Sequence, residues 1–233
     1  IATSRLHRLV RARWLAPVRK GLFFVLPLEA GAQTTIDDPW VLASESFSPC
    51  YIGGWSAAEH WGLTEQIFRP TFVVTAGSAR TSTVTLLGCE FRTVRSSRAR
   101  VEIAASVWRG AVRVAVSDRE RTLADALENP NWVGGIRHLA EMVARYKRSE
   151  HWNPTKLLAA MRVHPKGSAY KRLGYLTESL LGSDEVIVRE ALAHRSTGVI
   201  RLDPRVRKGG KRLKRWGLWL NVAIANSTGD EAS

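Results

Sequence analysis

The stretch Ala111–Pro130, AVRVAVSDRERTLADALENP, changes its hydrophobic period in the middle. Its first seven residues alternate between valines and other residues, which is typical of a β-strand. Asp118 then stands at the position of a helix N-cap, and the residues after it predict a helix that ends at Pro130. The change indicates a domain in which strands are followed by helices, and we expect an α+β fold.

Further runs with strand character precede this point. They are Arg69–Ala76 and the residues 81–88 and 89–94, which alternate and are rich in β-branched side chains. Upstream of them, Asp38-Pro39 is typical of an N-cap followed by a first-turn proline, and it predicts a helix through about Phe47.

After Asp118 the pattern is mainly helical. Helices are predicted for residues 134–147, after Asn153-Pro154, for residues 168–182 and after Ser183-Asp184. Two closing runs, residues 197–202 and 215–224, have the character of strands on either side of a basic cluster. These elements predict a larger domain that combines a sheet with a set of helices.

The N-terminal segment predicts a helix followed by a hairpin. Residues 4–12 place leucines and a valine on one face and three arginines, spaced three apart, on another. The β-prone runs 14–18 and 22–26 follow, joined across Arg19-Lys20-Gly21. This order is typical of the back half of a winged helix-turn-helix, in which the helix enters the major groove and the hairpin contacts the DNA backbone. An amphipathic helix packed on a larger domain is the alternative.

A complete winged helix needs two more helices in front. Because the sequence begins without methionine, we expect upstream sequence to be missing. The predicted DNA-binding residues of this segment are Ser4, Arg5, His7, Arg8, Arg11, Arg13, Arg19 and Lys20.

The charge of the chain indicates a polyanionic partner. Lys and Arg number 35 against 21 Asp and Glu, a formal net charge of +14, and nucleic acid is the first partner to consider. No apolar run approaches the roughly 18 residues that a membrane helix needs, and no basic amphipathic helix with a broad apolar face is evident. We expect no membrane partner and a cytoplasmic location.

A second basic cluster lies near the C-terminus, in RVRKGGKRLKRW (205–216). It could follow a phosphate backbone, bind an acidic protein, or form a solvated loop between two strands. Its residues are Arg205, Arg207, Lys208, Lys211, Arg212, Lys214 and Arg215.

The stretch GWSAAEH (54–60) is similar to a serine nucleophile elbow. An elbow needs a buried strand before its serine, and the preceding SESFSPCYIGG is a poor strand. The three-residue spacing of Ser56 and Glu59 instead predicts a capping box at a helix start. We therefore assign Ser56 no catalytic role.

Nothing else in the sequence indicates catalysis. The histidines form no ligand cluster, and Cys50 and Cys89 have no metal-ligand spacing, so we expect buried free thiols, no metal and no cofactor. A nuclease would need clustered acidic ligands, which Glu90 and Glu102 do not supply. Gly77-Ser78 is similar to the opening of a nucleotidyltransferase motif, but the metal-binding acidic pair is absent. The expected protein is not an enzyme.

Several segments together resemble the AbiEi family, the antitoxin and transcriptional regulator of type IV toxin-antitoxin systems. In chain order they are SRLHRLVRARWLAPVRKGLFFV (4–25), YIGGWSAAEHWGLTEQ (51–66), RTLADALENPNWVGGI (121–136), KRLGYL (171–176), RLDP (201–204) and KRWGLWLNV (214–222).

The resemblance implies a winged helix joined to a larger mixed α/β antitoxin domain. It further implies repression of the protein's own operon at inverted repeats and neutralisation of a co-encoded nucleotidyltransferase-like toxin. By position, Arg5, Arg8 and Arg11 fall on the recognition helix and Arg19-Lys20 on the wing. A nucleic-acid-processing enzyme such as a nuclease, or a plain winged-helix regulator without a toxin, are the alternatives.

The predicted domain organisation follows from these segments. Residues 1–28 form a partial winged helix, 29–38 a linker, 39–226 the larger α/β domain and 227–233 a disordered tail.

Overall fold

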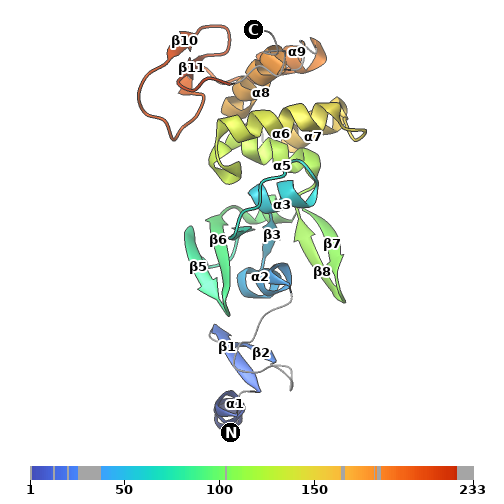
Figure 1. The fold of residues 1–233 in the computed structure, drawn as a ribbon, viewed down its shortest axis with the longest axis vertical. Coiled ribbons are helices and arrows are strands. Elements are labelled where there is room, and N and C mark those ends of the chain that lie inside the picture. The colour runs from blue at the N-terminus through green and yellow to red at the C-terminus, as the bar shows by residue number, and fades with distance from the viewer. Residues whose placement is uncertain are drawn as a thin grey trace, which may run out of the picture. The chain divides into compact units, whose positions relative to one another are not determined.

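The computed structural model describes residues 2–12, 14–19, 21–25, 38–102, 104–163, 166–180, 182 and 185–224 (Figure 1). The fold is mixed α+β, as predicted. The chain divides into two units, Ile1–Ile52 with Phe68–Val116 and Gly53–Ile67 with Ser117–Ser233. The predicted linker, apart from Asp38, and the predicted tail lie outside the described residues, so the predicted domain boundaries stay a prediction. No helix in the described part of the chain is long and apolar enough to cross a membrane.

The first unit begins with a helix and a hairpin. Helix α1 (Ala2–Arg11) is followed by strands β1 (Leu15–Arg19) and β2 (Leu22–Val25), which pair antiparallel. The predicted order of helix and hairpin is confirmed.

The rest of the first unit is built on a six-stranded mixed sheet in the order β5-β6-β4-β3-β8-β7 (Figure 1). The strands are β3 (Cys50–Ile52), β4 (Thr71–Thr75), β5 (Ser82–Leu86), β6 (Cys89–Arg95), β7 (Ala105–Arg109) and β8 (Val112–Val116). Helices α2 (Pro39–Phe47) and α4 (Arg98–Val101) accompany them. Four strands were predicted; β3 and β7 were not.

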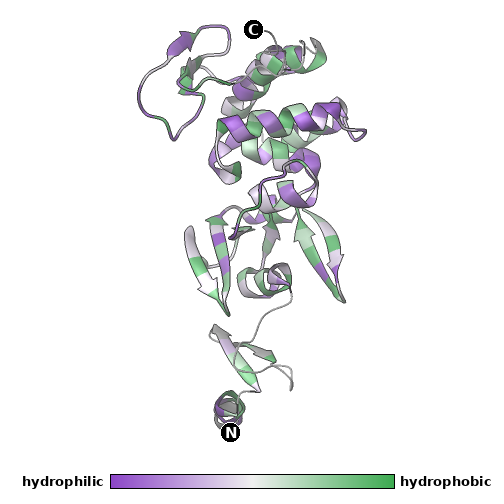
Figure 2. Ribbon diagram, viewed as in Figure 1, coloured by the Kyte–Doolittle hydropathy of each residue, from purple (hydrophilic) through white to green (hydrophobic). Residues whose placement is uncertain are grey.

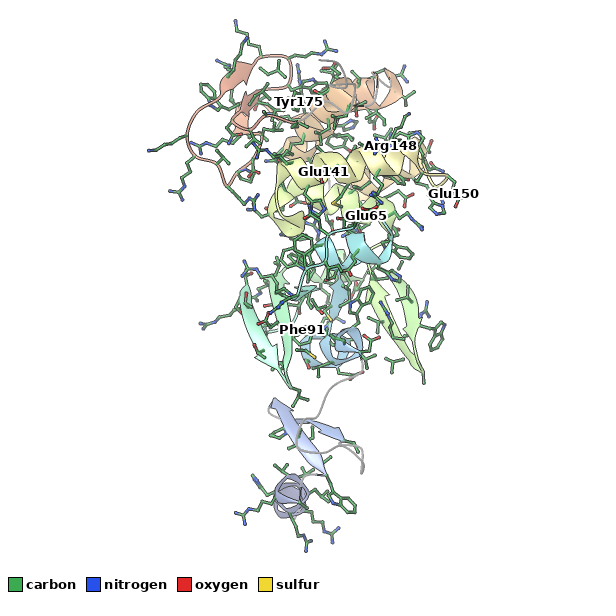
Figure 3. The ribbon with its side chains drawn as sticks, in the orientation of Figure 1. Glu65, Phe91, Glu141, Arg148, Glu150 and Tyr175 are labelled. Carbon is green, nitrogen blue, oxygen red and sulfur yellow. The ribbon has the colours of Figure 1, made fainter. Side chains whose placement is uncertain are left out.

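The core of this unit lies at its central strands. Every residue of β4 is buried, and so are Tyr51 and Ile52 of β3. Phe47 at the end of α2 meets Phe91 of β6 edge to face, with ring centroids 5.4 Å apart; Figure 3 labels Phe91. Because β3 lies between β4 and β8, its short apolar run is buried and forms a strand although Pro49 precedes it.

The helices α2 and α5 begin where the sequence predicts. The backbone N–H of Trp40 donates to Asp38 Oδ1 at 2.8 Å, and that of Arg121 donates to Asp118 Oδ1 at 2.7 Å. Each aspartate satisfies a backbone N–H that has no partner within its helix.

We expect Asp118→Ala to lower the free energy of unfolding by about 1 kcal/mol, because the Arg121 N–H loses its acceptor. Asp118→Asn retains an acceptor and is the matched control, expected within about 0.5 kcal/mol of the wild type. Urea denaturation measures both, and equal losses in the two variants would contradict the capping role.

The capping box predicted at Ser56 is wrong. Helix α3 (Gly54–His60) has Gly53 as its N-cap, three residues before the expected Ser56, and this glycine makes no side-chain cap hydrogen bond. Gly54 has φ +51°, a left-handed conformation that favours glycine, so the glycine pair sets the helix start and leaves Ser56 buried in the first turn. The strand that was expected to be missing before it is present as β3.

The second unit is mainly helical and is organised around α5 (Arg119–Glu128). All residues from Arg121 to Leu127 are buried, and α5 contacts α3, α6, α7 and α8. The other helices that follow it in the unit are the 3-10 helix η1 (Pro130–Val133), α6 (Ile136–Arg148), α7 (Pro154–Val163), α8 (Gly167–Leu180) and α9 (Glu185–His194). Figure 2 shows hydrophilic and hydrophobic residues alternating along α6, as one face packs and the other meets solvent.

A small sheet completes the second unit. Strands β9 (Ile200–Arg201), β10 (Lys211–Leu213) and β11 (Leu218–Leu220) lie in the order β10-β11-β9. β10 pairs antiparallel and β9 parallel with β11. The basic cluster is therefore not only a loop: Lys211 and Arg212 belong to a strand that the sequence analysis did not predict.

Candidate nucleic-acid interface

Helix α1 presents a row of arginines. Arg5, Arg8 and Arg11 are all exposed, while Leu6 and Val10 are half-buried. Residues three apart differ by about 60° around a helix, so the three guanidinium groups cover an arc of about 120°. His7 is also exposed on this helix. The arrangement places a positive face opposite the apolar one.

The hairpin follows this row after a short turn. The backbone N–H of Trp14 donates to the carbonyl of Leu9 at 3.0 Å and so ties the turn to the end of α1. Of the other predicted DNA contacts, Arg13 and Lys20 lie outside the described residues, as do the side chains of Ser4 and Arg19. No acidic residue precedes Glu29 in the sequence. The segment therefore carries positive charge without an internal counter-charge.

The second basic cluster surrounds β10. Figure 2 shows β10 as hydrophilic, and Figure 3 shows nitrogen-tipped side chains projecting from the segment around it. All seven predicted residues are exposed. Arg205 lies 3.6 Å from Asp203 and Arg215 lies 2.8 Å from Glu178, as ion pairs. The other five, which have no ion pair within the described part of the chain, are Arg207, Lys208, Lys211, Arg212 and Lys214.

Two buried cations of α8 hold the chain that leads into this cluster. Lys171 Nζ donates to the carbonyls of Gly198, at 2.7 Å, and Thr197, at 3.3 Å. Burial lowers the pKa of Lys171, and nearby Arg195 acts in the same direction. Arg172, the next residue, donates to the carbonyls of Arg201 in β9 and of Leu202 just after it, and to two carbonyls at the end of α5. Neither cation is a surface charge, and both act as anchors for backbone.

The same helix receives Trp216, the largest fully buried side chain among the described residues. A Cβ at Gly174 would overlap the six-membered ring of Trp216, so only glycine leaves room for the indole. The indole N–H donates to Glu178 Oε2 at 2.6 Å, and Glu178 Oε1 pairs with Arg215. Residues 171, 174 and 178, which share one face of α8, thus position the hairpin of β10 and β11.

We expect Gly174→Ala to lower the free energy of unfolding of the second unit by about 2 kcal/mol, since the added methyl group displaces Trp216. Alanine has the higher helix propensity, so the loss would come from overpacking alone. Thermal unfolding measures it, with Ser179→Ala on the same helix as control. A Gly174→Ala protein as stable as the control would contradict the contact.

Asp203 connects the start of the basic segment to α6. Its Oδ2 accepts from the backbone N–H of Ile136 at 3.1 Å, and its Oδ1 accepts from that of Arg205 at 2.9 Å. Asn221 completes the link by donating to the carbonyl of Asp203 at 2.7 Å. The buried carboxylate therefore caps α6 and shapes the turn after β9.

The other residues considered from the sequence are Gly77, Cys50 and Cys89, and their surroundings explain them without a catalytic or metal-binding role. Gly77 is packed against the carbonyls of Ser48 and Phe47, where a Cβ would have contacts of 3.0 and 3.3 Å. Cys50 and Cys89 are half-buried free thiols, and burial, aided by the Glu45 carboxylate, raises the pKa of Cys50 to about 12. Within the described residues no group of three His, Cys, Asp or Glu side chains is placed to hold a metal ion.

Comparisons with known proteins bear on the fold. No protein-family model matches the chain, and no curated protein matches it. The chain is similar in structure to the RV2827C protein from Mycobacterium tuberculosis, whose crystal structure gives a TM-score of 0.61 at 19% sequence identity. The similarity covers 93% of this chain and 78% of that chain. At this identity the likeness concerns the fold alone.

Proposed function

We propose that this protein is a cytoplasmic, non-enzymatic repressor that binds double-stranded DNA through α1 and the hairpin after it, and that it also acts as an antitoxin. The observation that carries the DNA-binding part is the exposed row of Arg5, Arg8 and Arg11 on a helix followed directly by an antiparallel hairpin. This is the order of a recognition helix and wing.

The physical basis is electrostatic. Three exposed guanidinium groups on one face suit phosphate oxygens or guanine edges, both of which arginine binds with two parallel hydrogen bonds. The half-buried Leu6 and Val10 supply the opposite, packing face of the helix. The C-terminal basic cluster adds to the attraction for a polyanion.

The antitoxin part rests on the resemblance to the AbiEi family. The segments that carry this resemblance in the second unit coincide with its structural framework. Residues 121–136 include most of α5, η1 and the start of α6, and residues 171–176 anchor the basic segment. Residues 201–204 include the end of β9, and residues 214–222 include β11. A surface on this framework would neutralise a nucleotidyltransferase-like toxin.

Footprinting of the region upstream of the protein's own gene tests the repressor. We expect protection of an inverted repeat, and uniform weak binding along the fragment would contradict an operator-specific repressor.

Co-expression with the neighbouring open reading frame tests the antitoxin. Relief of growth arrest is expected, and persistent arrest would leave a plain regulator.

A further inference from the structure

The small sheet of the second unit has a cationic and aromatic face. In the register of the strands, Trp219 of β11 pairs with Arg201 of β9 and with Arg212 of β10. Paired residues on neighbouring strands project from the same face of a sheet. All three are exposed, with 39% of Trp219 accessible. An arginine therefore stands on each side of the indole.

The other face of this sheet belongs to the core. Leu218 is buried and pairs with Ile200 and Leu213, which are half-buried. Leu218, Ile200 and Leu213 all pack in the hydrophobic core of the second unit. Because successive residues of a strand point to opposite faces, the burial of Leu218 makes Trp219 face outward.

The indole of Trp219 is held in place at its edge. Its N–H donates to the carbonyl of Gly209 at 2.7 Å. Gly210, at φ +114°, packs so closely that a Cβ would lie 2.8 Å from Trp219 Cδ1 and Nε1. Within the described residues no aromatic ring or cation stacks on this indole. The two glycines of KGGK thus fix the ring while leaving it accessible.

A groove adjoins this face. It has a volume of about 820 Å³ and is lined by Trp219, Arg201, Arg207, the first turn of α8 at Ser168, and Glu128. Neither Arg201 nor Arg207 has an ion pair in the described part of the chain, so both guanidinium groups are available to an anion. Glu128 supplies one carboxylate at the groove.

We propose that this face and groove bind single-stranded nucleic acid, with one base stacked on Trp219 and the flanking phosphates at Arg201, Arg207 and Arg212. Single strands offer free base faces, and aromatic side chains beside cations are the surface that binds them. A duplex hides its base faces in the helical stack, so duplex DNA would make little use of a fixed indole. This site lies apart in the chain from α1 and does not depend on the proposed operator binding.

Fluorescence anisotropy of the full chain with labelled oligomers of about twelve nucleotides tests the site, using oligo(dT), oligo(rU) and a duplex of equal length. We expect Trp219→Leu to weaken single-strand binding roughly tenfold and Trp219→Phe to remain within about threefold of the wild type, since phenylalanine also stacks. Tighter binding of either single strand than of the duplex supports the site, and tighter binding of the duplex would contradict it.

The double variant Arg201→Ala with Arg207→Ala is expected to lose about two phosphate contacts. The plot of the logarithm of the single-strand binding constant against the logarithm of salt concentration becomes less steep as a result. Lys208→Ala with Lys214→Ala removes equal charge outside the groove and is the matched control. Equal weakening by both pairs, or equal binding by Trp219→Leu and the wild type, would overturn the proposal. A variant in which Arg5, Arg8 and Arg11 are replaced by alanine separates this site from operator binding. We expect its affinity for single strands to equal that of the wild type.

Discussion

Replacing Arg172 with alanine is expected to lower the free energy of unfolding of the second unit by about 4 kcal/mol. The buried guanidinium donates from Nε to Leu202 O at 3.0 Å and from Nη2 to Arg201 O at 3.2 Å. Its Nη1 donates to Leu127 O at 2.9 Å and Glu128 O at 3.2 Å. Alanine would leave these carbonyls without their donor and open a cavity.

The electrostatics of Arg172 agree with this role. Burial lowers its pKa to about 10, and the nearby Asp203 carboxylate acts in the opposite direction. The group therefore stays charged at neutral pH, and its hydrogen bonds to carbonyls and the field of Asp203 offset the cost of burying it.

Urea denaturation with Arg172→Met as a second variant separates the contributions. Methionine fills most of the space but donates no hydrogen bond, so we expect a loss close to that of alanine. Arg189→Ala, an exposed arginine on α9, is the surface control and should change stability by less than about 0.5 kcal/mol. A Met variant as stable as the wild type would show that packing, and not the hydrogen bonds, accounts for the residue.

Replacing Arg5, Arg8 and Arg11 together with alanine is expected to weaken binding to operator DNA roughly a hundredfold near 0.1 M salt. Each phosphate contact releases about one counterion, so three lost contacts multiply into a large change in affinity. All three side chains are exposed on α1, and their loss should leave the fold intact.

A variant of equal charge controls for the general attraction of a basic protein to DNA. Arg148 at the end of α6, Arg189 in α9 and Arg195 just after α9 are exposed, and their replacement removes the same number of charges. We expect this control to lose no more than about fivefold in affinity. Gel-shift titrations compare the two variants, and similar losses would mean that net charge, not α1, determines binding.

Local chemistry explains which elements could be predicted from the sequence. Asp38, Asp118 and Asn153 cap α2, α5 and α7 as expected, because a short side chain bonds a backbone N–H two or three residues away. The N-cap predicted at Ser56 was wrong, because the spacing of Ser56 to Glu59 fits a capping box without forming one. The left-handed Gly54 before it had already started the helix.

Two of the strands that were not predicted, β3 and β10, have a different cause. β3 follows Pro49, and β10 is rich in lysine and arginine, so neither has a strong strand pattern of its own. Their pairing partners stabilise them: β3 between β4 and β8, and β10 against β11. Such long-range pairing overrides local preference.

The candidate sites divide in the same way. The arginines of α1 and of the C-terminal cluster could be found from spacing and charge. The sequence did not show that Arg201 and Trp219 lie beside Arg212 of the C-terminal cluster, because only the register of β9, β10 and β11 brings these three residues together. Lys171 and Arg172 were visible only as part of a segment with family resemblance, since charged residues are rarely fully buried. The alternation in Leu218–Leu220 was the one signal for an outward-facing tryptophan.

The salt dependence of operator binding tests the account most directly. The logarithm of the binding constant, plotted against the logarithm of salt concentration, has a slope set by the number of phosphate contacts. For the variant lacking Arg5, Arg8 and Arg11, we predict a slope that is less steep than that of the wild type by about three. The same slope in both proteins would contradict the assignment of α1 as the DNA-contacting helix.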